Sequence, residues 1–196
     1  MSPDPRTVDV IDVAMRVANA IELAGGTYFV GGSVASSLQG EPRATNDVDV
    51  VVDVPLGRID VLVSALGPDF EVDRDMLRDA ILNARSCNIF YLPVLMKVDL
   101  FGLGTSPYDE TEFARRRRVV VRDTGESLVV KSPEDTVLRK LLWYRMGGDV
   151  SDRQWRDVCE VLRVSGESME FPYLEAWASR LAIEDLLRRA RNESDR

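Results

Sequence analysis

The sequence predicts an α+β fold, in which a mixed β-sheet is flanked by helices and is followed by a C-terminal helical half. The chain opens with a helical apolar period, continues with short β-branched runs separated by glycine and proline turns, and ends with helical periods alone. Its 196 residues are 45% hydrophobic, which is enough to bury a core in one domain or two small ones. We expect an α+β domain over residues 1–131 and a helical region over 132–196 packed on it.

The first predicted element is an amphipathic helix over residues 7–24, with Thr7 as its N-cap and Gly25-Gly26 as its end. A short strand over 27–30 then leads into the turn Gly31-Gly32-Ser33. The small residues 34–38 that follow favour one or two helical turns. The chain therefore predicts the order helix, strand, glycine turn, helix.

The next element, residues 46–52, is typical of a strand because most of its residues are β-branched. Alternation along a strand places Asp47, Asp49 and Val51 on one face. The valines at 48, 50 and 52 take the other face, so the strand is expected to be half-buried.

The remaining elements follow the same apolar periods. We expect helices at 59–66, 76–84, 134–146, 152–164 and 172–191, and strands at 87–92, 94–101, 118–122 and 128–131. Pro93 predicts a hairpin or a sharp bend between two of these strands. Ser132 and Pro133 are good first residues for the helical half.

Composition excludes several classes of function. The chain has no histidine, which excludes catalysis based on an imidazole, and a net charge of −8, which argues against a generic nucleic-acid coating protein. Cys87 and Cys159 show no metal spacing and are interpreted as buried reduced thiols of a cytoplasmic protein. We find no signal peptide and no apolar stretch of about 18 residues, so we expect neither secretion by that route nor a membrane span.

The acidic strand is the main candidate for chemistry. Two aspartates at i and i+2 of a strand lie roughly 6.5 Å apart on one side, where a divalent cation can bind both. Asp99, which shares a strand face with Lys97, is the best candidate for a third acid. Two alternatives stay open: Asp-x-Asp pairs are frequent in acidic loops and edge strands, and Lys97 with Asp99 fits an edge strand protected against aggregation.

The Gly31-Gly32-Ser33 turn adds a possible phosphate site. Between a strand and a helix, its backbone N–H groups and the Ser33 hydroxyl can approach phosphate oxygens at a helix N-terminus. The placement of lysine also favours a phosphate site. The chain has only three lysines, at 97, 131 and 140, and two of them, Lys97 and Lys140, fall in the motifs described next.

These motifs, taken together, resemble the nucleotidyltransferase-fold superfamily, the DNA polymerase β-like group. The resemblance covers Tyr28–Ala35, with its Gly-Ser turn, and Arg43–Val50, with its alternating aspartates. It extends to the AbiEii-type toxins of that superfamily. Lys97-Val98-Asp99 resembles their second motif, Lys140 in the run 134–141 their third, and Arg156-Asp157 their fourth.

The resemblance implies a role for each matched residue. Asp47 and Asp49 would bind Mg²⁺ or Mn²⁺, and Asp99 would bind a second metal or act as the base. Gly32 and Ser33 would hold the β and γ phosphates, and Lys140 would neutralise the triphosphate. The nucleotide-binding set that we predict comprises Gly32, Ser33, Arg43, Thr45, Lys97, Lys140 and Asp157.

The leading hypothesis is a metal-dependent nucleotidyltransferase that moves a nucleoside monophosphate from an NTP to a hydroxyl. The acceptor would be RNA such as tRNA, a protein or a small molecule, and the family suggests a toxin–antitoxin or phage-defence role with an antitoxin partner. The alternatives are an inactive nucleotide-binding sensor or partner-binding protein of the same fold, and an acidic scaffold in which the aspartates are structural.

An arginine run and four aromatic residues are interpreted mainly as structural features. Arg115–Arg118 fits either an RNA-phosphate patch or, as we favour, a solvated helix end paired with preceding acids. Four aromatic residues on helical segments are interpreted mainly as core, with base stacking as the minor alternative for the first two. These are Trp143, Tyr144, Trp155 and Trp177.

Overall fold

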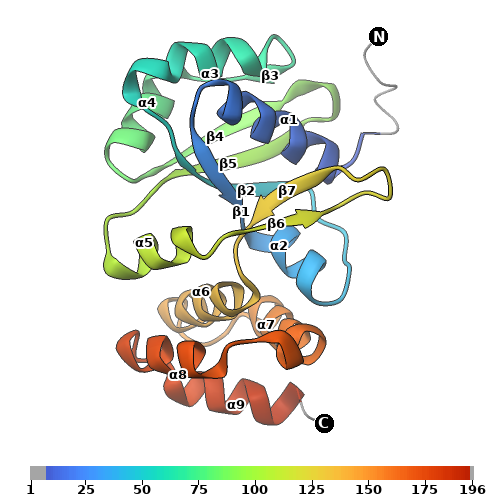
Figure 1. Cartoon of the computed structure of the whole chain (residues 1–196), viewed down its shortest axis with the longest axis vertical. Helices are drawn as coiled ribbons and strands as arrows, with labels where there is room; N and C mark the ends of the chain where they lie inside the picture. Colours follow the sequence, from blue (N-terminus) through green and yellow to red (C-terminus); the bar gives the residue numbers. More distant parts are fainter. Residues whose placement is uncertain (1–7, 195–196) are drawn as a thin grey trace. The chain divides into compact units, whose positions relative to one another are not determined.

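A computed structural model describes residues 8–194 of the chain (Figure 1). The chain divides into two compact units. The first unit contains the residues up to 34 together with 44–130, and the second contains 35–43 together with the residues from 131 onward. The segment 35–43 therefore belongs with the C-terminal helices, although it precedes most of the sheet in the sequence.

The first unit is built on one mixed sheet of seven strands in the order β3-β4-β5-β2-β1-β7-β6. The strands are β1 Thr27–Val30, β2 Asp47–Asp53, β3 Phe70–Glu71, β4 Ser86–Tyr91, β5 Met96–Gly102, β6 Arg117–Val120 and β7 Ser127–Val130. β2 pairs parallel with β5 and antiparallel with β1, and β1 pairs parallel with β7. Together with its flanking helices, this sheet confirms the α+β prediction.

Helices cover one face of this sheet (Figure 1). They are α1 Val10–Leu23, α3 Ile59–Leu66 and α4 Arg74–Leu82; α1 and α4 pack on the strands, and α3 contacts both of them. The side chains of Val48, Val50 and Leu100 point into this layer and are fully buried. α5, Pro107–Ala114, lies elsewhere in the unit, and its Phe113 ring packs 5.7 Å from the Phe29 ring of β1.

Two local predictions for the first unit need correction. Asp9, not Thr7, caps α1: its carboxylate accepts hydrogen bonds from the Ile11 and Asp12 amides, and the Asp12 carboxylate accepts one from the Asp9 amide. Thr7 itself lies outside the described residues. The two-residue β3 was missed because it is too short to show a period, and α5 was expected only as the helix end before the arginine run.

The arginine run is also arranged differently from the helix end that we favoured. Arg115 caps the C-terminus of α5, whereas Arg117 and Arg118 open strand β6. Arg118 forms an ion pair with Glu22 of α1, and Arg116 lies over the Phe113 ring with its guanidinium carbon 4.1 Å from the ring centroid. The run therefore spans a helix end and a strand.

The second unit is helical. Its helices are α6 Pro133–Met146, α7 Asp152–Ser165, α8 Phe171–Arg180 and α9 Glu184–Ser194, and it also contains the end of α2, Gly32–Gln39, which starts in the first unit. Ser132 caps α6, with Pro133 as the first helical residue, as predicted. The single helix predicted over 172–191 is wrong: it breaks into α8 and α9 at Ala182, which has a left-handed φ of 56°.

Other side chains correct the predicted core. Cys87 is buried, but Cys159 is only partly buried. Trp143 is exposed on α6, whereas its neighbour Tyr144 is buried against the Trp155 ring at 5.2 Å. Within residues 8–194, no helix has both the length and the apolar character that a bilayer span requires.

Candidate functional site

The pairing of β2 with β5 brings the acidic residues of the two strands together. The strands are parallel and in register, so that Asp47 lies opposite Lys97 and Asp49 lies opposite Asp99. Residues paired in this way point to the same side of a sheet, here the side away from α1 and α4. Both strands lie inside the sheet, so the edge-strand alternative for Lys97 and Asp99 is wrong.

A hydrogen bond from Thr45, two residues earlier, orients the Asp47 side chain. The Thr45 hydroxyl donates a hydrogen bond to Oδ1 of Asp47 at 2.6 Å, across the two residues before the strand. This bond restricts the rotation of a carboxylate that is only partly buried. Thr45, predicted as a nucleotide contact, thus lies beside the acidic strand and orients its first acid.

Asp99 is paired with Lys97 on its own strand. The Lys97 Nζ lies 2.7 Å from Oδ2 of Asp99, and Asp99 is 13% exposed while Lys97 is 41% exposed. The pKa of Lys97 is raised, chiefly because its ammonium donates a hydrogen bond to Asp99, while partial burial opposes the shift. The charges of Asp99, Asp47 and Asp49 raise it further, so the ammonium interacts with all three acids.

The glycine turn lies directly against Asp49. The Gly31 amide donates a hydrogen bond to the Asp49 carbonyl at 2.8 Å, which continues the β1–β2 pairing into the turn. Gly32, the first residue of α2, has a φ of 52°, and a Cβ placed on it would lie 1.7 Å from Oδ2 of Asp49. Only glycine therefore fits between the start of α2 and this carboxylate. Ser33, the next residue, is buried.

Two residues that the sequence analysis did not single out extend this face onto β4. Asn88 lies opposite Asp99 and Phe90 opposite Lys97 in the antiparallel β4–β5 pair. Both side chains are exposed, and they alternate with the buried Cys87 and Ile89. The alternation of polar and apolar residues in this strand was the signal that could have placed Asn88 on the acidic face.

The chemistry of these acids suits a hard cation. Carboxylate oxygens are the donors that Mg²⁺ prefers, and three of them face the same side of the sheet. In the arrangement described for residues 8–194, no three potential ligands are grouped closely enough to form a metal site. Metal binding by Asp47, Asp49 and Asp99 therefore stays a prediction.

The other predicted nucleotide contacts form a separate cluster inside the second unit. The Lys140 ammonium of α6 lies 2.8 Å from Oδ2 of Asp157 on α7. Arg43 donates to both oxygens of the same carboxylate at 3.0 Å, and the Ser36 hydroxyl also donates to it. The Lys140 and Asp157 side chains are only 8% and 7% exposed.

Burial and pairing have opposite effects in this cluster. Burial lowers the pKa of Lys140, and its hydrogen bond to Asp157 offsets only part of that effect. Burial raises the pKa of Asp157, but hydrogen bonds from Arg43 and Lys140 outweigh it and leave the value lowered. Asp157 is thus held ionised by two cations, and the roles of Lys140, Arg43 and Asp157 toward a nucleotide stay predictions.

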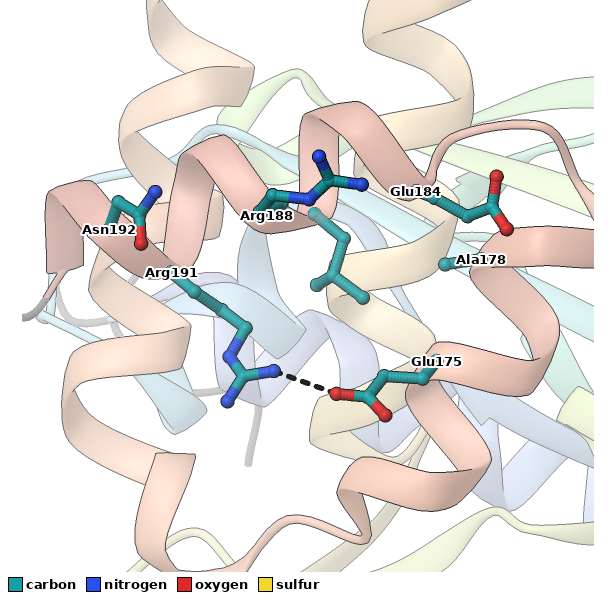
Figure 2. A pocket seen from close by; sticks show the side chains of 7 residues that line it. Glu175, Ala178, Glu184, Arg188, Arg191 and Asn192 are labelled. Atoms are coloured by element: carbon teal, nitrogen blue, oxygen red, sulfur yellow. Dashed lines mark hydrogen bonds and ion pairs between the residues drawn. The ribbon is translucent and has the colours of Figure 1, made fainter.

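The second unit also has a surface cavity of about 390 Å³ between α8 and α9 (Figure 2). Two acids, Glu175 and Glu184, and two arginines, Arg188 and Arg191, line it, and Arg191 forms an ion pair with Glu175 at 2.8 Å. The cavity contains none of the predicted site residues. Because its charges balance, it offers no strong attraction to an anion.

Comparison with known proteins finds no matching family model and no matching curated protein. Two solved structures are similar in fold. The antibiotic-resistance nucleotidyltransferase ANT(2'')-Ia matches with a TM-score of 0.52 and 14% identity over 93% of this chain and 99% of its own. An antigenic nucleotidyltransferase-like protein from Paracoccidioides brasiliensis matches with a TM-score of 0.56 and 18% identity over 94% of each chain.

The two matches extend over nearly the whole chain, so they include the sheet that positions Asp47, Asp49 and Asp99. The closer likeness to AbiEii-type toxins stays a prediction. The similarity of the two structures is one of fold, and it agrees with the fold predicted from the sequence. The protein therefore has the nucleotidyltransferase fold.

Proposed function

We propose that the protein is a metal-dependent nucleotidyltransferase, which transfers a nucleoside monophosphate from an NTP to a hydroxyl acceptor and releases pyrophosphate. The observation that carries the proposal is the register of β2 and β5. It places Asp49 opposite Asp99, with Asp47 two residues earlier, beside a glycine turn bonded to the backbone of Asp49. Such an arrangement provides an acidic face and a helix N-terminus within one small region.

Each residue has a distinct part in this proposal. Asp47, Asp49 and Asp99 would hold Mg²⁺ or Mn²⁺, which when bound supplies neutralisation of charge on the phosphates. The Gly32 and Ser33 end of α2 would hold phosphate oxygens, because backbone N–H groups at a helix N-terminus favour anions. Asp99 would hold a second metal or accept the proton of the acceptor hydroxyl.

The test is incubation of the protein with each α-labelled NTP, Mg²⁺ or Mn²⁺, and total RNA. We expect label transfer to fall by about a hundredfold or more in Asp47→Asn and in Asp49→Asn, because each variant lacks a carboxylate that would hold the metal in this proposal. Asp53→Asn is the matched control, since Asp53 lies at the far end of the same strand and is exposed. Equal losses in all three variants would contradict the proposal.

The same incubation distinguishes the alternative of an inactive nucleotide-binding protein. The ion pair of Lys97 with Asp99 favours that alternative, because it occupies one of the three acids with an internal cation. NTP binding that depends on metal, without label transfer to RNA, protein or small hydroxyl compounds, would support the sensor. A toxin role with an antitoxin partner is a further proposal, and metal-dependent label on tRNA would support it.

A further inference from the structure

The hairpin that joins β4 to β5 exposes apolar side chains at its tip, which we define as residues 90–96. From Leu92 to Met96 the tip contains no polar side chain. Phe90 is 38% exposed, Leu92 41% and Leu95 76%. Single exposed apolar residues are common on protein surfaces, but a group of them on one short segment is a feature of interaction sites.

Leu95, the most exposed of the three, also has an unfavourable backbone conformation. Its φ of 52° and ψ of 39° lie in the left-handed region, which is costly for residues other than glycine and asparagine. Turns of this kind normally carry Gly, Asn or Asp. In the free protein, the side chain of Leu95 gains little burial to offset this cost.

Charged residues flank Phe90 along the sheet. The strand registers place one row of residues across β3, β4, β5 and β2, namely Glu71, Phe90, Lys97 and Asp47. Phe90 thus lies between an exposed acid, Glu71, and a lysine. Lys97 is already paired with Asp99, whereas Glu71 forms no ion pair in the part of the chain that the structure describes.

A further acid lies beside the turn. The Leu92 amide donates a hydrogen bond to the Asp69 carbonyl at 2.8 Å, and the Asp69 side chain is 42% exposed. Its ion pair with Arg16 is long, at 3.7 Å. The acids around the hairpin tip therefore outnumber the bases, in a chain whose net charge is −8. A surface with an apolar centre and an acidic rim is complementary to a partner with a basic rim.

We propose that the hairpin tip is a docking site for a protein partner, which buries Phe90, Leu92 and Leu95 in an apolar pocket rimmed by lysine or arginine. A few buried anchor side chains provide most of the binding energy at such interfaces. A second copy of this chain is a poor occupant, because it would bring the same acids to the interface. The proposal does not depend on nucleotide transfer.

The test uses a displayed library of random peptides, selected against the full chain. We expect the enriched peptides to share an apolar residue flanked by Lys or Arg, and their binding to weaken with salt. The affinity of the strongest peptide is then measured by fluorescence anisotropy. Leu95→Asn should lower it about tenfold or more, and Glu71→Gln about threefold.

Leu23→Asn is the matched control, because Leu23 is 67% exposed at the end of α1. It should leave the peptide affinity unchanged. Equal losses in Leu23→Asn and Leu95→Asn would contradict the proposal. Enriched peptides that are acidic, or a selection that enriches no peptide over the Leu95→Asn protein, would overturn it.

Two further measurements address the fold and the identity of the occupant. Asn adopts the left-handed region more readily than Leu, so Leu95→Asn should melt at the wild-type temperature or about 2–4 °C above it. A lower melting temperature would show that Leu95 packs within the fold, against the proposal. A dimer that Leu95→Asn abolishes would assign the hairpin tip to a second copy and overturn the proposal. Nucleotide transfer should be unchanged in Leu95→Asn, which separates the docking site from the proposed function.

Discussion

The protein has two clusters of paired acidic and basic side chains, and they differ in burial and in the ratio of acids to bases. On the sheet, Lys97 pairs with Asp99 beside Asp47 and Asp49, on a face where the carboxylates are only partly buried. In the helical unit, one aspartate is held by a lysine and an arginine and is almost fully buried. The first cluster places three carboxylates beside the Lys97 ammonium, whereas in the second a single carboxylate, Asp157, has two cationic partners.

This difference separates groups that are available to a ligand from groups that hold the structure. An exposed carboxylate retains part of its hydration and can exchange partners at little cost, whereas a buried one must keep its partners. Of the predicted contacts, the sheet acids and the glycine turn therefore remain the ones on which the proposed function depends. Arg43, Lys140 and Asp157 have the character of a structural cluster that fixes segment 35–43 to α6 and α7.

The largest effect that tests this comparison is on stability. In Asp157→Asn, the buried Lys140 ammonium loses its charged partner, so we expect the free energy of unfolding, measured in urea, to fall by about 3–5 kcal/mol. The same substitution at the partly buried Asp47 should lower it by less than about 1 kcal/mol.

A double variant controls for the loss of side-chain contacts. Lys140→Met combined with Asp157→Leu removes both buried charges, so it should recover most of the stability lost in Asp157→Asn. If Asp157→Asn were as stable as the wild type, Asp157 would not be a structural anchor, and its predicted role toward the nucleotide would gain weight.

The next effect concerns the glycine turn beside Asp49. In Gly32→Ala, the new Cβ would meet the Asp49 carboxylate at a position with a φ of 52°, so that carboxylate must move. We expect about 1–2 kcal/mol lower stability and a loss of nucleotide transfer of about a hundredfold.

Gly57→Ala is the matched control for this variant, because nothing lies within 4 Å of a Cβ at Gly57 and its φ is not positive. It should keep both stability and transfer near the wild-type values. Full transfer activity in Gly32→Ala, measured with labelled NTP, would show that the close approach of the turn to Asp49 has no part in the reaction.

The sequence predicted the acidic face well, because local alternation determines it. The period of two in residues 47–52 and 97–101 placed the aspartates on the face opposite the valines, as observed. The register that sets Asp49 against Asp99 came from long-range pairing, which no local pattern encodes. The choice of Asp99 as the third acid came first from its place in an apolar strand and then from the resemblance to a known fold, and the pairing places its strand beside that of Asp47 and Asp49.

The wrong predictions also arise because long-range packing is not encoded in a local sequence pattern. Trp143 and Cys159 were assigned to the core from residue type, but burial depends on which side of a helix faces its neighbours. The break at Ala182 was missed because a non-glycine residue adopts a left-handed φ there, where neither Gly nor Pro gives a signal. The contact of Arg43 with Asp157 joins residues far apart in the sequence and could not be read from either motif.

The smallest effect that sharpens the comparison is at Thr45, whose hydroxyl orients the first acid of the sheet cluster at 2.6 Å. Thr45→Val keeps the shape of the side chain and removes the donation of this hydroxyl to Oδ1 and, at 3.4 Å, to the carbonyl oxygen of Asp47. A hydrogen bond to a charged group corresponds to about 1.5–3 kcal/mol. We expect Mn²⁺ affinity and nucleotide transfer to fall about tenfold, with the free energy of unfolding nearly unchanged.

Thr124→Val provides the control, because the Thr124 hydroxyl also donates to an acid two residues later, Glu126, in an exposed turn. Equal changes of Mn²⁺ affinity and transfer in the two variants would contradict this prediction. The hydrogen bond at Asp47 would then be an ordinary surface contact that does not contribute to cation binding.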